Sequence, residues 1–227
     1  MRTRYLRYII CAASIIGAQQ AIAQNQNFQG LYVQGAIGYE SSSPSVDGYV
    51  IKSTAGTPSA GTYYPTVSLS SKTFTDYSIG IGYGFRIGDK SILTLGVNIN
   101  PQNQDYDARV ALSGYIISPS TGTLKNRRQY FIAPGYELDD KSLIYAKLGM
   151  VSASFENAPD TANMNGVLYG IGYKSFFDKK MYYYGEINAA NLSKSTVSGP
   201  GITFNGTFSY DVSAISTNIL VGVGYKF

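Results

Sequence analysis

The stretch from Ile215 to Phe227 reads I-S-T-N-I-L-V-G-V-G-Y-K-F and decides the fold. Side chains of a strand point alternately to its two faces. One face therefore carries Ile215, Thr217, Ile219, Val221, Val223, Tyr225 and Phe227, and the other carries Ser216, Asn218, Leu220, Gly222, Gly224 and Lys226. The first face is apolar and aromatic, whereas the second is small or polar apart from Leu220. This contrast predicts a strand that separates an apolar environment from a more polar one.

Similar alternation recurs along the chain and predicts eight strands in all. Their expected bounds are 29–40, 76–87, 91–100, 124–138, 142–155, 164–177, 181–192 and 209–227. Pro134 lies inside the fourth segment and removes one ladder hydrogen bond, which predicts a bulge there.

The connections between these strands alternate in length. Three short turns, 88–90, 139–141 and 178–180, each carry an Asp-Lys pair. Four longer polar connections are expected to be loops at 41–75, 101–123, 156–163 and 193–208. Short turns at one end and long loops at the other are typical of bacterial outer-membrane barrels.

The N-terminal segment predicts export. Arg2, Arg4 and Arg7 precede a short apolar run, and Ala21-Ile22-Ala23 is a small-residue cleavage site. We therefore expect a signal peptide at 1–23 and a barrel domain at 24–227. The apolar run is shorter than the roughly 20 residues of a spanning helix.

Composition supports an exported membrane protein. Charged residues are only 14% of the chain, while Tyr (21) and Gly (25) are abundant. Most of the net positive charge leaves with the expected signal peptide, so nucleic acid is not an expected partner. The only cysteine, Cys11, leaves with it too, which excludes disulfides and thiolate chemistry from the mature chain.

A Gly-Tyr pair recurs near the end of each even-numbered predicted strand, before a short turn or the C-terminus. In each pair the glycine is expected to point inward and the tyrosine outward. The four tyrosines, Tyr83, Tyr136, Tyr173 and Tyr225, are therefore predicted to form one aromatic girdle at a membrane interface.

The signal peptide, eight alternating strands, unequal connections and V-G-V-G-Y-K-F ending resemble the small outer-membrane barrels. This group includes the OmpA membrane domain, OmpX-type proteins and opacity-type adhesins. The resemblance covers the expected mature chain and implies an all-β, eight-stranded antiparallel up-and-down transmembrane β-barrel in the outer membrane of a Gram-negative bacterium. It also implies that the barrel-assembly machinery recognises the last strand, here through Val221, Val223, Tyr225 and Phe227.

Several kinds of chemistry are disfavoured by the residues. The chain has no histidine, which removes Ser-His-Asp triads, Cys-His pairs and imidazole metal ligands. The glycines at 80, 82 and 84 recur every two residues and lack the spacing of a dinucleotide-binding loop. We therefore predict no enzyme activity, no metal and no cofactor. A lipid-modifying enzyme is disfavoured by the missing histidine. A soluble lipocalin-like carrier is disfavoured because the large apolar residues lie on the face opposite to the glycines and charges.

Charged residues on the inward face predict the content of the barrel. An eight-stranded barrel is just wide enough for side chains to fill, and buried charges must be paired. We expect an ion-pair network of Arg86, Glu137, Lys147, Lys174 and Glu186. Two interpretations of it stay open: a structural plug, and a gated path for ions.

Two outer features predict contacts beyond the barrel. Arg127 and Arg128 open the fourth strand at its outer end, with Lys125 beside them, and arginines there suit lipopolysaccharide phosphates. The connection 41–75 carries Tyr63 and Tyr64, and tyrosines favour protein contacts. We therefore expect a structural or surface-interaction barrel whose external loops contact a host, a neighbouring cell or lipopolysaccharide. The alternative is a small-solute or ion pore through the charged lumen.

Overall fold

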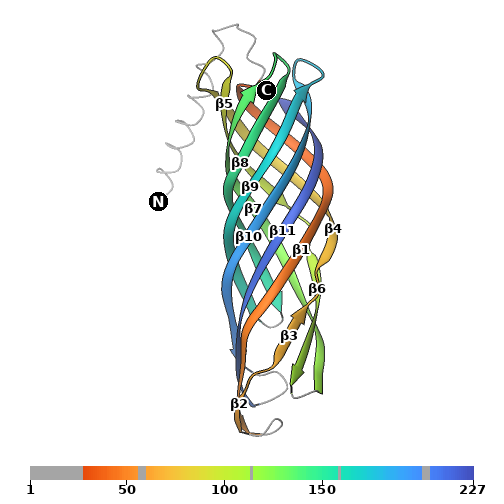
Figure 1. The fold of residues 1–227 in the computed structure, drawn as a ribbon, viewed down its shortest axis with the longest axis vertical. Helices are drawn as coiled ribbons and strands as arrows, with labels where there is room; N and C mark the ends of the chain where they lie inside the picture. The colour runs from red at the N-terminus through yellow and green to blue at the C-terminus, as the bar shows by residue number, and fades with distance from the viewer. Residues whose placement is uncertain (1–27, 56–59, 113–114, 158–159, 201–204) are drawn as a thin grey trace, which may run out of the picture.

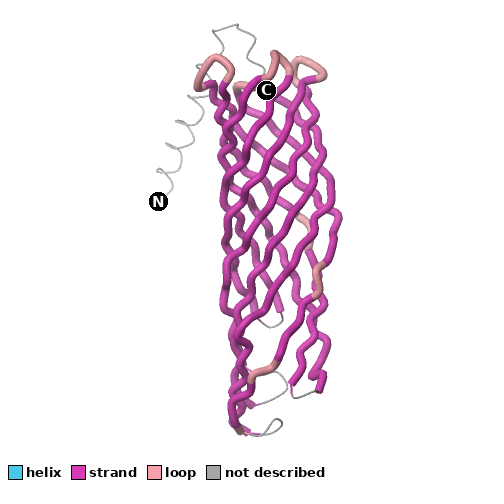
Figure 2. Tube along the Cα trace, in the orientation of Figure 1, coloured by secondary structure: helices cyan, strands magenta, loops and turns pink. Residues whose placement is uncertain are grey.

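The computed structural model describes residues 28–55, 60–112, 115–157, 160–200 and 205–227 (Figure 1). Strands make up nearly all of them, and none lies in a helix long and apolar enough to span a membrane (Figure 2). The expected signal peptide at 1–23 lies outside the described residues.

Eleven strands are present in this part of the chain. They are β1 (Gly30–Ala55), β2 (Gly61–Tyr63), β3 (Thr66–Leu69), β4 (Lys72–Arg86), β5 (Ser91–Asn100), β6 (Gln104–Leu112), β7 (Tyr115–Glu137), β8 (Ser142–Asn157), β9 (Asp160–Phe176), β10 (Met181–Pro200) and β11 (Asn205–Lys226).

Eight of these strands close into a ring of antiparallel pairs, as predicted. Its order is β4, β1, β11, β10, β9, β8, β7 and β5, and β5 pairs with β4 to complete it. The first and last strands of the ring pair along a register that runs from Tyr32↔Lys226 to Ala55↔Asn205. The three short turns and the C-terminus lie at one end of the barrel (Figure 1).

The other end corrects the loop prediction, because most of the expected loop residues continue the sheet. β1 extends to Ala55, β10 to Pro200, and β11 begins at Asn205. β6 carries on from β5 beyond residues 101–103 and pairs with β7, while β3 pairs with β6 and β2 with β1. Polar Ser- and Thr-rich segments were expected to be loops, but their backbones are held by ladder pairing. We call this end of the barrel, made of the added segments and the adjoining ends of the predicted strands such as 209–214, the extension.

The extension inverts the chemistry of the two faces of the wall. Near the short turns, β11 points Ile219, Val221 and Val223 outward. In the extension, the same strand buries Tyr210 and Val212 and turns polar residues outward. An apolar cluster fills the inside of the extension and continues behind the apolar outer face as far as Phe131 and Ala133: Tyr106, Leu124, Phe131, Ala133, Val151, Ala153, Phe155, Ala162, Met164, Leu168, Ala190, Leu192, Val197, Tyr210, Val212 and Ala214. The outer face of the wall therefore changes from apolar near the turns, where we call it the outer apolar band, to polar in the extension, where the inner face is apolar.

The outer apolar band has the height of a bilayer core. On β4 it runs from Tyr77 to Ile87, close to the ~9–11 residues of a spanning strand. Its end nearest the extension carries a second set of outward tyrosines, which we call the outer girdle: Tyr39, Tyr77, Tyr130 and Tyr169. Two aromatic girdles thus bracket the band.

The bulge in β7 lies at a different place from the one predicted. Pro134 pairs regularly with Leu93 of β5, so the proline leaves the register unchanged. The register instead shifts between Lys125 and Arg128, where Asn126 has a φ of 56°. Asn tolerates this left-handed conformation better than most residues, which explains why the irregularity lies there.

Candidate functional site

The interior of the barrel carries a charged cluster where the band meets the extension. Arg127 of β7 forms ion pairs with Glu40 of β1 and with Asp76 of β4, the latter at 3.0 Å. All three side chains are buried, and Arg127 is only 5% exposed. We call Glu40, Asp76 and Arg127 the outer charged cluster.

Amides surround this cluster and complete its hydrogen bonds. Asn100 Nδ2 donates to Asp76 Oδ1 at 2.9 Å, and Gln102 Nε2 donates to the same oxygen. Gln104 Nε2 donates to Glu40 Oε2 at 3.0 Å. Buried charges are tolerated when they are paired and hydrogen-bonded in this way.

A second charged cluster lies closer to the short turns. Lys147 Nζ of β8 donates to Glu186 Oε2 of β10 at 2.7 Å, and Tyr145 OH donates to Glu186 Oε1 at 2.7 Å. We call Tyr145, Lys147 and Glu186 the inner charged cluster. Both of its charged residues are buried.

Two asparagines connect the clusters across the lumen. Asn188 Nδ2 donates to Glu186 Oε2 at 3.1 Å and to Asn218 Oδ1 at 3.0 Å. Asn218 Nδ2 then donates to Asp76 Oδ2 at 2.8 Å. Side chains from β4, β7, β8, β10 and β11 therefore share one hydrogen-bonded system.

Lys174 is held by aromatic rings. Its ammonium lies 4.2 Å from the ring centre of Tyr32 and 4.4 Å from that of Tyr182. Such cation–π contacts stabilise a desolvated ammonium. Tyr182 also packs edge-on against Phe176, which packs against Phe28, so aromatic side chains fill the turn end of the lumen.

The predicted five-residue network is therefore divided among three places. Lys147 and Glu186 form the inner charged cluster, Lys174 lies among the tyrosines, and Arg86 pairs with Glu137 in a bidentate contact at 2.8 and 2.6 Å. The Arg86–Glu137 pair is partly exposed beside a short turn, where Arg86 also donates to the Asp89 carbonyl. The division arises because Arg86 and Glu137 occupy the strand ends, several residues from Glu186 along the barrel.

Arg127 corrects the prediction of three lipopolysaccharide contacts. It points into the lumen, whereas its neighbour Arg128 is exposed on the outer wall. Lys125 forms an ion pair with Glu156 of β8. Counting back from the inward Glu137 in steps of two reaches Arg127, so strand periodicity contains the signal that was missed. Asp76, which has the same inward parity as Arg86, was missed in the same way.

Two small cavities lie in the described part of the lumen. One of about 20 Å³ lies beside the outer charged cluster, and one of about 10 Å³ lies among the rings at the turn end. Cavities of this size hold about one water molecule. No group of three or more His, Cys, Asp or Glu able to hold a metal occurs within the described ranges.

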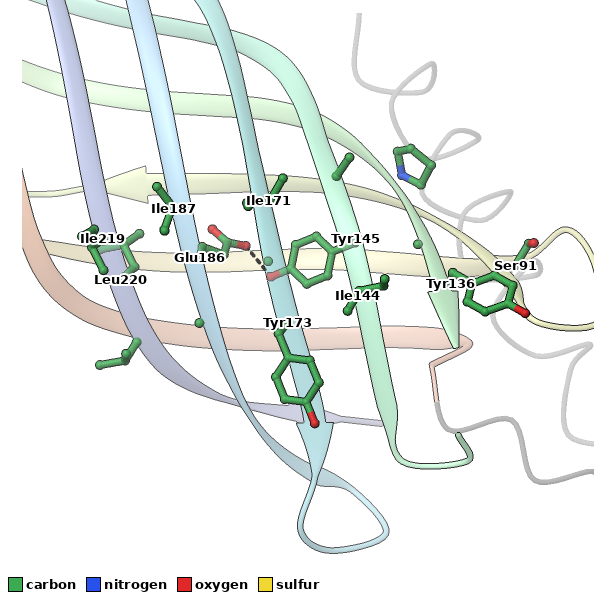
Figure 3. A pocket seen from close by; sticks show the side chains of 16 residues that line it. Ser91, Tyr136, Ile144, Tyr145, Ile171, Tyr173, Glu186, Ile187, Ile219 and Leu220 are labelled. Atoms are coloured by element: carbon green, nitrogen blue, oxygen red, sulfur yellow. Dashed lines mark hydrogen bonds between the residues drawn. The ribbon is translucent and has the colours of Figure 1, made fainter. Parts of the chain in front are cut away.

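A large hollow lies on the lipid-facing wall (Figure 3). It is a shallow groove of about 910 Å³ across β7 to β11, bounded by outward residues such as Ile144, Ile171 and Ile187. Small residues at Pro134, Ala146 and Gly185 make it. Its apolar lining belongs to the outer apolar band, so we assign it no separate function.

The remaining predicted site residues lie on the outer surface. Tyr136, Tyr173 and Tyr225 point outward at the turn end, and Tyr83 is half-buried there. Val221, Val223 and Phe227 are exposed along β11. Tyr63 ends β2 at the tip of the extension, and Tyr64 beside it is 75% exposed.

Ion pairs are present on the outer surface of the extension as well. Lys194 Nζ of β10 lies 2.7 Å from Asp47 Oδ2 of β1. The hydrogen bond and negative charge of Asp47 raise the pKa of Lys194 above its usual value. Thr196 Oγ1 donates to Asp211 Oδ1 at 2.7 Å nearby.

Comparisons with known proteins agree with this architecture. The family model of the outer membrane protein β-barrel domain matches residues 9–227. No curated protein sequence matches the chain. Among solved structures, OprG from Pseudomonas aeruginosa is similar with a TM-score of 0.60 and 14% identity, over 88% of this chain and 96% of that one.

Two further structures are similar at lower scores. The protease OmpT from Escherichia coli has a TM-score of 0.49 and 8% identity, over 88% of this chain and 97% of that one. Ail, the attachment invasion locus protein of Yersinia pestis, has a TM-score of 0.45 and 14% identity, over 88% of this chain and 99% of that one.

Proposed function

The chain belongs to the outer membrane protein β-barrel domain family and lies in the outer membrane of a Gram-negative bacterium. From this premise we propose that its extension is a recognition surface outside the cell. The observation that carries the proposal is the inversion of the wall. A polar outer face backed by an apolar core is a folded surface in water rather than a lipid-facing wall.

Rigidity supports a binding role for the extension. Its strands pair along most of their length, so a ligand meets a surface that loses little conformational freedom on binding. The exposed tyrosine at the tip, Tyr64, is of the residue type that favours protein contacts. The partner class that we propose is a protein on a host or neighbouring cell.

Surface display tests this proposal. The full chain is expressed in a non-adherent Gram-negative strain, and attachment of the bacteria to cultured host cells and to other bacteria is counted. We expect attachment above the empty strain, and a loss of at least half of it for Tyr64→Ser. Tyr136→Ser, in the girdle at the turn end, is the matched control. Equal attachment of the displaying and empty strains would contradict the proposal.

We also propose lipopolysaccharide as a partner of the outer wall, with Arg128 as the contact. Arg128 is outward and lies two residues from Tyr130 of the outer girdle, at the level where lipid phosphates are expected. Co-purified lipopolysaccharide is expected to fall in Arg128→Ala and to stay unchanged in Lys226→Ala at the opposite end. An unchanged amount in both variants would remove Arg128 from this role.

Assembly involves a different face. We propose that the barrel-assembly machinery recognises β11 through Val221, Val223, Tyr225 and Phe227, all on its outward face. Deletion of Phe227 is expected to lower the amount of folded protein in the outer membrane, measured by heat-modifiable migration in gels. An Ile215→Ala variant, on the same face of β11 at the opposite end of the band, serves as the control.

The alternative of a pore is less favoured, since charged and aromatic side chains pack across the lumen and the two small cavities beside them hold about one water each. Conductance of the full chain in planar bilayers tests it. We expect no stable openings from the wild type or from Glu186→Gln. Steady openings that change in size in Glu186→Gln would make the lumen the functional part.

A further inference from the structure

A small cavity inside the barrel adjoins two buried polar atoms that have no hydrogen-bond partner in the described structure. Arg127 Nε and Asn188 Oδ1 are these atoms. The cavity of about 20 Å³ is lined by both residues, together with Glu40, Ser216 and Asn218. Both side chains are at least nine-tenths buried. A buried polar atom without a hydrogen-bond partner destabilises the fold, so two such atoms beside one cavity point to a ligand.

We propose that this cavity is a binding site for one ordered water molecule that bridges Arg127 Nε and Asn188 Oδ1. A water needs about 10–15 Å³ and two to four polar partners, and both conditions are met. The inference rests on the lumen and is independent of the proposed role of the extension.

The chemistry of the lining selects water over an ion. Arg127 Nε can only donate a hydrogen bond and Asn188 Oδ1 can only accept one. The ligand must therefore accept from one side and donate to the other, as water does. A cation would face the Arg127 guanidinium, and an anion would face the Glu40 carboxylate and the Asn188 carbonyl oxygen.

The water would close a ring of hydrogen bonds across the lumen. Asn188 donates to Asn218, Asn218 donates to Asp76, and Arg127 donates to Asp76. The step from Arg127 to Asn188 is the one that the protein leaves open, and the water supplies it. The ring would hold β4, β7, β10 and β11 together at the level where the outer apolar band ends.

Nuclear magnetic resonance of the full chain in lipid nanodiscs tests the site directly. The Nε–H resonance of Arg127 is assigned as the one that disappears in Arg127→Lys. We expect a cross-peak between this proton and water, with the sign of a dipolar contact and not of chemical exchange. An assigned Arg127 Nε–H resonance without that cross-peak would overturn the proposal.

A variant that fills the cavity sharpens the test. In Asn188→Leu the side chain occupies the space and removes the acceptor, so the cross-peak is expected to vanish. Asn165→Leu, on the exposed face of β9, is the control and is expected to keep it. Persistence of the cross-peak in Asn188→Leu would overturn the bridge. If Asn188→Leu fails to fold, wild-type electron density decides: a water peak within hydrogen-bond distance of both atoms supports the site, and its absence rejects it.

Discussion

The two halves of this barrel follow the same alternation of side chains but place opposite chemistry on it. In the half near the short turns, Ile219 and Val221 face outward and Asn218 faces inward. In the extension, Tyr210 and Val212 face inward and polar side chains face outward. The backbone pattern is unchanged along β11, so the difference comes from the surroundings: lipid outside one half and water outside the other.

This difference teaches where the stabilising burial lies. In lipid, outward apolar side chains meet a medium as apolar as themselves. The half near the short turns is therefore held by its ladders, its buried charged clusters and the aromatic cluster inside the turn end. In water, the extension must bury apolar area inside, as a soluble domain does. The outer charged cluster lies at the level where the lipid-facing band ends and the water-facing extension begins.

The largest expected effect concerns the outer charged cluster, which lies where the band meets the extension. Arg127→Ala leaves Glu40 and Asp76 buried without their cation, and breaking a buried pair in this way costs about 3–5 kcal/mol. Arg128→Ala, one residue away but on the outer wall, is expected to cost about 0.5 kcal/mol or less. Denaturant unfolding from lipid bilayers measures both. Similar losses of unfolding free energy in the two variants would mean that the outer charged cluster does not stabilise the barrel.

Next in size is the contrast between inner and outer apolar residues. Phe155→Ala removes a ring from the core of the extension and is expected to cost about 3–5 kcal/mol. Ile171→Ala, on the lipid-facing wall of β9, is expected to cost much less because acyl chains fill the space. The same unfolding experiment compares them, and a larger loss for Ile171→Ala would reverse our assignment of lipid and water.

Added charge tests the same boundary from outside. In Ile171→Lys the new ammonium would face the hydrocarbon, and this is expected to lower the unfolding free energy by about 2–4 kcal/mol near the midplane. Ser213→Lys, on the outward face of β11 in the extension, is expected to leave the unfolding free energy almost unchanged. Equal tolerance of the two substitutions would place water beside Ile171.

The smallest effect concerns a surface pair of the extension. Asp47 raises the pKa of Lys194, so the contribution of this pair is present below the unfolded-state pKa of lysine, about 10.4, and is lost as pH rises through the folded-state pKa. The Lys194 side-chain titration followed by nuclear magnetic resonance should move down in Asp47→Asn. An unchanged titration in Asp47→Asn would show that the pair does not form in solution.

Much of the fold follows from period-two alternation. The alternation seen in 215–227 recurs in seven other segments, and it locates the eight strands, the three short turns and the outward tyrosines. The extension could not, because its apolar residues switch faces and its Ser- and Thr-rich stretches, such as 41–46, resemble loops in composition. Long-range pairing of β1 with β11 and of β6 with β7 keeps these stretches extended.

The interior was harder to predict than the wall. Alternation gives the inward position of Lys147 and Glu186, but it does not give their height in the barrel, which depends on strand stagger. Glu186 and Lys147 therefore meet, while Arg86 and Glu137 meet elsewhere. The pairing of Arg127 with both Glu40 and Asp76 requires three strands that are distant in sequence.

The long pairing of β1 with β11 has a consequence for the order of folding. Every other pair in the eight-stranded ring joins strands that lie much closer together in the sequence. The β1–β11 ladder joins Tyr32 to Lys226 and spans almost the whole described chain. Such non-local closure is slow because the loop entropy is lost before the contacts form. Pairing of β1 with β11 should therefore be the last step of folding. The intermediate before this step is an open sheet in which these two strands are unpaired edges.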